Sequence, residues 1–185
     1  MERKRHLFLT GERQVGKSTL LRALIAQASL ACAGFETKPF FVDGERRGFV
    51  MHGLVPMPPF ENDCVISVRL GERRSAPVLP AFEENGVEIL RRSLAGNAPF
   101  LLMDELGRLE RDATAFAAQV RACLNGGKRV LGVLQRCDAP LPREIAARED
   151  VLLLTVTPEN RGALLRDLCE PKLLHGALRT GARLP

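Results

Sequence analysis

Residues 11–18 have the types and spacing of a phosphate-binding loop. Their sequence, GERQVGKS, matches the pattern G-x-x-x-x-G-K-[ST]. In such a loop the glycines let backbone N–H groups turn inward around phosphate oxygens, and the helix that follows adds the positive end of its dipole. We call this segment the phosphate loop. We expect it and the residue after it to bind a polyphosphate through Gly11, Glu12, Arg13, Gln14, Val15, Gly16, Lys17, Ser18 and Thr19.

The last residues of the phosphate loop carry side chains that could do chemistry. The Lys17 ammonium is placed to reach the β- and γ-phosphates and to neutralise the charge that is transferred, so Lys17 is a catalytic candidate. The Ser18 hydroxyl can be a ligand of Mg²⁺, and Thr19 lies where it can touch the α-phosphate. The expected substrate is therefore a nucleoside triphosphate, and the expected cofactor is Mg²⁺.

A second candidate segment is the apolar run Phe-Leu-Leu-Met, which is followed by Asp104 and Glu105. A buried strand that ends in carboxylates has the form of a Walker B segment. We assign Asp104 as the second metal ligand and Glu105 as the base that takes a proton from water attacking the γ-phosphate.

Two further polar residues could assist this pair. Glu110 could orient the metal shell or a water, or it could be a solvated loop carboxylate. Gln135 follows the apolar residues 130–134, where it could sense the γ-phosphate or simply end a strand. Their local sequence leaves both interpretations open.

These side chains need a scaffold of alternating strands and helices. Apolar runs predict strands at 6–10, 35–42, 48–54, 64–70, 99–104, 129–134 and 151–156. Apolar residues at three-four spacing predict helices at 17–31 and 112–124, and Thr157-Pro158 predicts the start of a last helix, with Thr157 as its N-cap. Such alternation is typical of an α/β fold with a mainly parallel sheet flanked by helices.

One region breaks the alternation. Asp43-Gly44 between two strand-like runs is a strong hairpin signal, so we expect an antiparallel hairpin insertion there. No linker or internal repeat divides the sequence, and we expect one domain over 1–185.

Composition narrows the function classes. The 185 residues carry 27 Lys and Arg against 22 Asp and Glu, a net charge of +5 that suits an anionic ligand. Tryptophan and tyrosine are absent, which argues against a single-stranded nucleic-acid binder.

No apolar run approaches the roughly 20 residues of a membrane-spanning helix. The 5 cysteines are scattered without metal-ligand spacing. We expect a monomer in the cytoplasm with reduced cysteines and no membrane partner.

The ordered motifs resemble the nucleoside-triphosphatase family of the thermophile and human cancer-related type. Besides the phosphate loop, the resemblance rests on Gly34-Phe35 with Thr37, and on Gly44-x-Arg46-x-Gly48-Phe49. It also rests on Asp104-Glu105-Leu106-Gly107 with Glu110, and on Asn160-Arg161 after an apolar strand. Matching positions run over 7–165, although 55–98 contribute little.

This resemblance implies a RecA-like P-loop NTPase domain that hydrolyses nucleoside 5′-triphosphates to diphosphates with Mg²⁺ and little base selectivity. It makes Asn160 and Arg161 candidates for contacts near the base, and Arg46 a candidate for a phosphate or structural role. Solubility of a helix could equally explain Arg161.

The chain departs from the family pattern at several positions. Arg13 and Gln14 replace small or rigid residues, so Arg13 could act as a built-in transition-state cation or could crowd the loop. Pro39 and Phe41 stand where a glutamate and an arginine are usual, and Gln135 stands where histidine is more common.

Two other functions remain open. A P-loop kinase for a nucleotide or small molecule uses the same loop and Mg²⁺, and Arg69, Arg73 and Arg74 could supply its lid or form a solvated basic loop. The second alternative function is a nucleotide-dependent binding module with slow turnover. A switch GTPase is disfavoured because the sequence has no Asn-Lys-x-Asp segment.

Overall fold

Strands and helices alternate over much of the chain in the computed structural model, which describes residues 4–71 and 74–169. In chain order the elements are β1 (His6–Thr10), α1 (Lys17–Gln27), β2 (Cys32–Val42), β3 (Glu45–Gly53), β4 (Asp63–Arg69), β5 (Ser75–Pro77), the π-helix η1 (Ala81–Gly86), α2 (Val87–Ala95), β6 (Phe100–Leu106), α3 (Thr114–Asn125), β7 (Arg129–Leu134), α4 (Pro140–Ala146), β8 (Val151–Thr155) and α5 (Arg161–Cys169).

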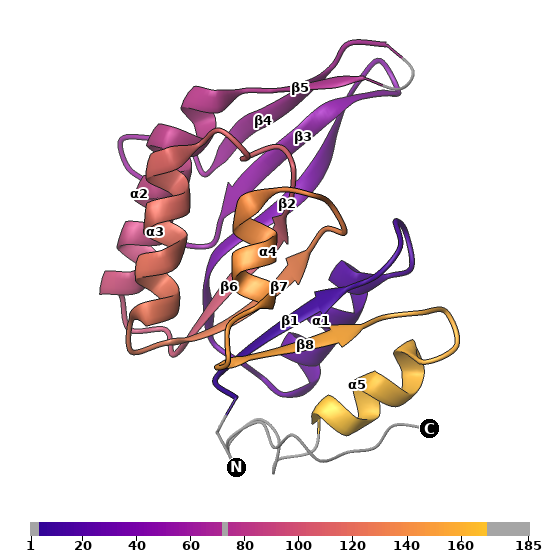
Figure 1. Ribbon diagram of the computed structural model, residues 1–185. Helices are drawn as coiled ribbons and strands as arrows, with labels where there is room; N and C mark the ends of the chain where they lie inside the picture. The colour runs from indigo at the N-terminus through magenta and orange to yellow at the C-terminus, as the bar shows by residue number, and fades with distance from the viewer. Residues whose placement is uncertain (1–3, 72–73, 170–185) are drawn as a thin grey trace.

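The described strands form one sheet in the order β5-β4-β3-β2-β6-β7-β1-β8. The strands from β2 through β6, β7 and β1 to β8 are parallel. Parallel neighbours end at the same edge of a sheet, so the loops after β1 and β6 open on one side (Figure 1). The predicted α/β class with a mainly parallel sheet is confirmed.

The predicted hairpin is also confirmed, but it extends the main sheet. Asp43 and Gly44 join β2 to β3 with φ values of 51° and 77°, the positive values that a tight type I′ turn requires. The first residues of the long strand β2 pair with β6, and its later residues pair only with β3. Strands β4 and β5 then continue the sheet antiparallel.

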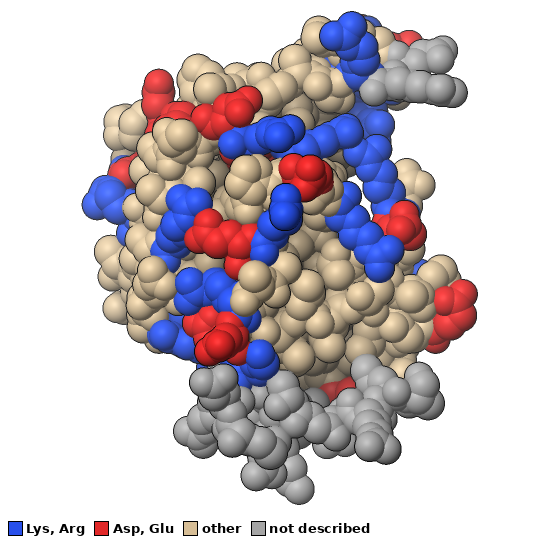
Figure 2. Space-filling view, in the orientation of Figure 1, with Lys and Arg blue, Asp and Glu red and all other residues tan. Residues whose placement is uncertain are grey.

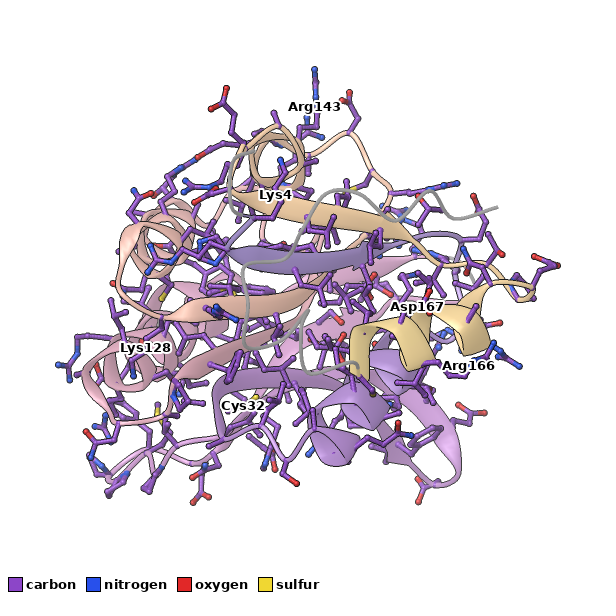
Figure 3. The ribbon with its side chains drawn as sticks, turned by 90° about the horizontal axis from the view of Figure 1, so that it is seen from below. Lys4, Cys32, Lys128, Arg143, Arg166 and Asp167 are labelled. Atoms are coloured by element: carbon purple, nitrogen blue, oxygen red, sulfur yellow. The ribbon has the colours of Figure 1, made fainter. Side chains whose placement is uncertain are left out.

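Helices cover both faces of the sheet, and each face has its own apolar core. On one face α2, α3 and α4 pack around Phe35 and Phe116, which are fully buried. On the other face α1 and α5 pack on β1 and β8. Figure 3 shows this from below, with α5 near Arg166 and α4 near Arg143 on opposite sides of the sheet.

Among the described residues, no helix has the length and apolarity to span a bilayer.

Several predicted boundaries were wrong. Helix α1 ends at Gln27, because Ser29 has a φ of 50° and turns the chain toward β2. Helix α5 begins at Arg161 rather than Pro158. The predicted cap at Thr157 is nevertheless confirmed, because its hydroxyl accepts a hydrogen bond of 3.3 Å from the Asn160 N–H and its carbonyl accepts one of 3.2 Å from the Arg161 N–H.

Four elements of the structure were not predicted from the sequence: β5, η1, α2 and α4. Proline is accepted in the first turn of a helix, and α4 begins with one at Pro140.

His6, in β1, contacts the last turn of α3 and the beginning of β7. Its ring is fully buried, Nε2 lies 3.0 Å from the Leu124 carbonyl oxygen, and Nδ1 accepts a hydrogen bond of 3.0 Å from the Val130 N–H. Burial lowers the pKa of His6 to about 4, against a partial opposing effect of Asp150. The ring is therefore neutral in the folded protein at neutral pH, with Nε2 as donor.

This neutral histidine predicts a specific pH dependence of stability. The unfolded chain takes up the proton near pH 6.5, whereas the folded chain resists it until about pH 4. Folding stability is therefore lost as the pH falls below 6.5. Relative to His6→Gln, we expect the free energy of unfolding of the unmodified chain to fall by about 2 kcal/mol between pH 7.5 and 5. Urea unfolding of both proteins measures this, and a pH-independent difference would contradict it.

Candidate functional site

The phosphate loop turns sharply between β1 and α1. Gly11 has a φ of 143°, and a Cβ there would lie 2.4 Å from the Val156 carbonyl oxygen, so only glycine fits. Gly16 has a φ of 94° and precedes the first residue of α1. The loop therefore ends at a helix N-terminus, where the positive end of the dipole favours an anion.

The Lys17 side chain curls back into the phosphate loop. Its ammonium donates hydrogen bonds to the carbonyl oxygens of Gly11, at 3.1 Å, and Glu12, at 2.7 Å. Lys17 is only 8% exposed. A buried ammonium held by neutral carbonyls is a ready partner for a phosphate oxygen, because an anion binds it more strongly than a carbonyl does.

The Ser18 hydroxyl connects the phosphate loop with the carboxylates at the end of β6. It donates a hydrogen bond of 2.7 Å to Asp104 Oδ1, across 86 residues of sequence. Burial raises the pKa of Asp104 to about 6, the Ser18 hydrogen bond lowers it in part, and the Glu105 charge raises it further. The two predicted metal ligands are therefore brought together.

Glu105 faces the cations of the phosphate loop. Burial raises the pKa of Glu105, and the charges of Lys17 and Arg13 oppose this rise. Its backbone N–H donates a hydrogen bond of 3.1 Å to the Thr37 hydroxyl on β2. A partly buried carboxylate with a raised pKa, beside two cations, suits a group that accepts a proton.

Glu110 and Gln135 hold the segment that follows β6. The Glu110 carboxylate accepts a hydrogen bond from the Gly107 N–H, and burial raises the pKa of Glu110 to about 7. Gln135 Oε1 accepts a hydrogen bond of 3.3 Å from the Arg108 N–H. Glu110 is buried, so the alternative of a solvated loop carboxylate is wrong.

The donor set fits Mg²⁺ bound together with a polyphosphate. No group of three or more His, Cys, Asp or Glu side chains among the described residues could hold a metal ion. Ser18 and Asp104 place two oxygen atoms side by side. This number suits Mg²⁺, which commonly takes one or two protein oxygens and completes its octahedron with phosphate oxygens and water.

The segment after β8 lies on the other flank of the phosphate loop. A Cβ at Gly16 would lie 3.5 Å from Arg161 Nη1, so this guanidinium is beside the loop. The Asn160 amide accepts a hydrogen bond of 2.8 Å from the Thr157 N–H and donates one of 2.9 Å to the Thr155 carbonyl. Asn160 therefore shapes its own turn, and Arg161 is the residue of this pair whose side chain lies beside the phosphate loop.

Two other predicted loop residues make contacts of their own. Glu12 forms a 2.8 Å ion pair with Arg136 after β7, and Val15 packs against the core under α1. Their backbone N–H groups stay part of the loop, while their side chains hold it against its neighbours.

An open cleft of about 810 Å³ runs from the phosphate loop across the sheet. Figure 2 shows the molecule hollowed on the side where the tips of β2–β5 project, with Lys and Arg side chains along the border. The loop residues that line it are Arg13, Gln14, Gly16, Lys17, Ser18 and Thr19. It is also lined by Glu105, Arg108, Glu110 and Gln135 on one side, and by Thr37, Arg46, Phe49 and Arg69 on the other.

Some of these residues carried no functional signal in the sequence. Thr37 entered only through the family resemblance, and Arg108 and Ser67 were not singled out. Arg69, predicted as part of a kinase lid, lies in the cleft wall at the end of β4, whereas Arg74 is exposed and Arg73 lies outside the described residues. Pro39 and the exposed Phe41 lie toward the outer end of β2.

Comparison with known proteins follows this geometry. A family model described as NTPase matches residues 6–169. The human cancer-related nucleoside-triphosphatase is 29% identical over 89% of this chain and 94% of its own. A solution structure of a human cancer-related nucleoside triphosphatase has a TM-score of 0.65 at 30% identity, covering 89% of this chain and 95% of that one. The crystal structure of THEP1 from Aquifex aeolicus has a TM-score of 0.69 at 24% identity, covering 88% and 96%.

Proposed function

The chain belongs to the NTPase family and hydrolyses nucleoside triphosphates, and we propose that it does so with Mg²⁺ in the cleft between the phosphate loop and β6. The observation that carries this proposal is the hydrogen bond between Ser18 and Asp104. It joins the two oxygen ligands that the ion needs, at a helix N-terminus that favours phosphate.

In this proposal each side chain has one role. The loop N–H groups and Lys17 bind the β- and γ-phosphates, and Lys17 neutralises the charge that moves to the leaving diphosphate. Ser18 and Asp104 would hold Mg²⁺, which would supply positive charge to the bound triphosphate. Glu105 orients a water toward the γ-phosphorus and takes its proton as the new bond forms. Arg13 adds positive charge beside the same phosphates.

Broad base specificity is part of the proposal. Asn160 is a candidate for base contacts, but its side-chain amide is already hydrogen-bonded to the backbone of its own turn. The Arg161 guanidinium places a positive charge near the phosphate loop, but it has no set of donors and acceptors that distinguishes one base from another. With no assigned side chain to read the base edge, we expect ATP, GTP, CTP and UTP all to be substrates.

We also propose that the chain acts as a monomer in a reducing, cytoplasmic setting, without membrane or nucleic-acid partners. All the groups assigned to the reaction come from this one chain, and its five cysteines are free thiols.

Replacing Lys17 with alanine tests the phosphate loop. We expect Lys17→Ala to lower the rate of phosphate release about 100- to 1,000-fold, because the transferred charge loses its fixed cation. Lys4→Ala is a matched control, since Lys4 bonds to the Glu149 carbonyl and lies outside the cleft lining. A malachite-green assay measures phosphate, and unchanged release by Lys17→Ala would contradict the assignment.

Replacing Glu105 with glutamine tests the proposed base. We expect single-turnover hydrolysis to slow about 100-fold or more, with Mg-nucleotide binding nearly unchanged. Glu84→Gln, an exposed change on η1, is the control. If Glu105→Gln keeps the single-turnover rate, another group is the base.

The raised pKa of Glu105 also predicts the pH profile. Only the ionised carboxylate accepts a proton, so activity falls as the pH drops through a midpoint above the usual carboxyl range. Glu105→Gln should lack this acid limb, and an identical limb in both proteins would assign it to another group.

A substrate panel tests the cofactor and the base specificity. We expect rates within about tenfold of one another for ATP, GTP, CTP and UTP, and loss of activity when EDTA removes Mg²⁺. Turnover of a single base, or full activity without a divalent cation, would refute this part of the proposal.

A further inference from the structure

The cleft continues well past the phosphate loop, onto the antiparallel half of the sheet. Its outer part is lined by Arg46, Phe49, Ile66, Ser67, Arg69 and Ser75, which we call the outer subsite. These residues lie on β3, β4 and β5. The mechanism proposed above uses none of them.

The outer subsite and the segment after β8 lie on opposite flanks of the phosphate loop. The sheet order places β8 on one side of β1, and β7, β6 and the antiparallel strands on the other side. Arg161 approaches Gly16 from the β8 flank. A nucleoside near Arg161 and a triphosphate on the loop therefore leave the outer subsite beyond the γ-phosphate.

Ser67 is a buried polar group without a partner in this wall. Ser67 is 0% exposed, and its Oγ has no hydrogen-bond partner among the residues that the structure describes. A register shift between β3 and β4 lets both Ile66 and Ser67 be buried, although neighbours in a regular strand face opposite ways. A buried hydroxyl without a partner is unfavourable, so its retention in a cleft wall points to a ligand that bonds to it.

The charges of the cleft favour an anion there. Among the described residues that line the cleft, five are cations and two are carboxylates: Arg13, Lys17, Arg46, Arg69 and Arg108, against Glu105 and Glu110. Lys17 and Arg13 are assigned to the triphosphate, and Arg108 lies on the Gln135 side of the cleft. Arg46 and Arg69 are the cations at its outer end.

Contacts within the protein hold the two outer arginines in place. The Arg46 guanidinium lies over the Phe49 ring, 5.4 Å from its centroid. Arg69 Nε donates a hydrogen bond of 2.7 Å to the Gly71 carbonyl. Guanidinium groups held in this way bind a tetrahedral oxyanion at little entropic cost.

We propose that the outer subsite binds a phosphate dianion beside the γ-phosphate, with Arg46 and Arg69 pairing its charge and Ser67 donating a hydrogen bond. The position beside the γ-phosphate rests on the proposed function. This dianion has two possible sources with the same chemistry. It is either the inorganic phosphate released by hydrolysis or the phosphate group of a second small molecule, a phosphomonoester.

Calorimetric titration of the nucleotide-loaded protein tests the proposal. The full chain is saturated with Mg²⁺ and a β,γ-imido triphosphate, which occupies the phosphate loop, and is then titrated with inorganic phosphate or, separately, with glycerol 3-phosphate. We expect one equivalent of at least one ligand to bind. Tighter binding of inorganic phosphate identifies the product as the occupant, tighter binding of glycerol 3-phosphate identifies a phosphomonoester, and equal binding supports the shared chemistry.

Three variants locate the binding. Arg46→Ala should weaken it about tenfold or more and Ser67→Ala about fivefold, by loss of a charge-assisted hydrogen bond. Arg47→Ala should leave it unchanged, because Arg47 pairs with Glu45 and lies outside the cleft lining. Without phosphate, Ser67→Ala should melt no lower than the unmodified chain, because its Oγ has no hydrogen bond to lose.

The proposal is overturned if neither ligand binds while the triphosphate analogue is in place. It is also overturned if Arg46→Ala and Ser67→Ala bind as tightly as the unmodified chain. Phosphate release from triphosphate, measured on the same preparations, separates the two proposals. Hydrolysis without this binding refutes the outer subsite alone, and binding without hydrolysis refutes the proposed function alone.

Discussion

The hydrogen bond from Ser18 to Asp104 is the contact on which the site depends. It joins the first turn of α1 to the end of β6 across 86 residues of sequence, and it is possible only because β1, β7 and β6 are parallel neighbours. Their carboxyl ends share one edge, so a loop after β1 and a carboxylate on β6 face the same space. Burial there raises the pKa of Asp104 to about 6 and thereby disfavours its charged form, which a bound cation would favour.

The other half of the sheet gives the site its second wall. Strand β2 is shared, because its first residues pair with β6 and its last residues pair only with β3. Thr37, near the middle of β2, accepts a hydrogen bond from the Glu105 N–H. The same strand therefore steadies the proposed base and carries the antiparallel strands that extend the cleft. These strands place Ser67 and Arg46 in the cleft wall beyond the phosphate loop, where the proposed second anion would contact them.

Prediction from sequence succeeded where local chemistry decides structure. The turn at Asp43-Gly44 follows from the positive φ values that these residue types accept, and the phosphate loop follows from its glycines and its lysine. It failed where tertiary packing decides. Helix α2 buries Ile89 and Leu90, but no helix was predicted over its residues. The cap predicted at Thr157 is present, but Asn160 completes it by accepting a hydrogen bond from the Thr157 N–H, a pairing that the cap residue alone does not reveal.

The sequence alone therefore determined the phosphate loop, the carboxylate pair at the end of an apolar strand and the α/β class, because these depend on residue types at short spacing. Only the tertiary structure decided which groups share the cleft. It buried Glu110, used Asn160 to hold a turn, and brought Arg46, Ser67 and Arg69 opposite the phosphate loop. The reason is physical: strand order and a register shift set these distances, and both arise from long-range pairing that neighbouring residues do not encode.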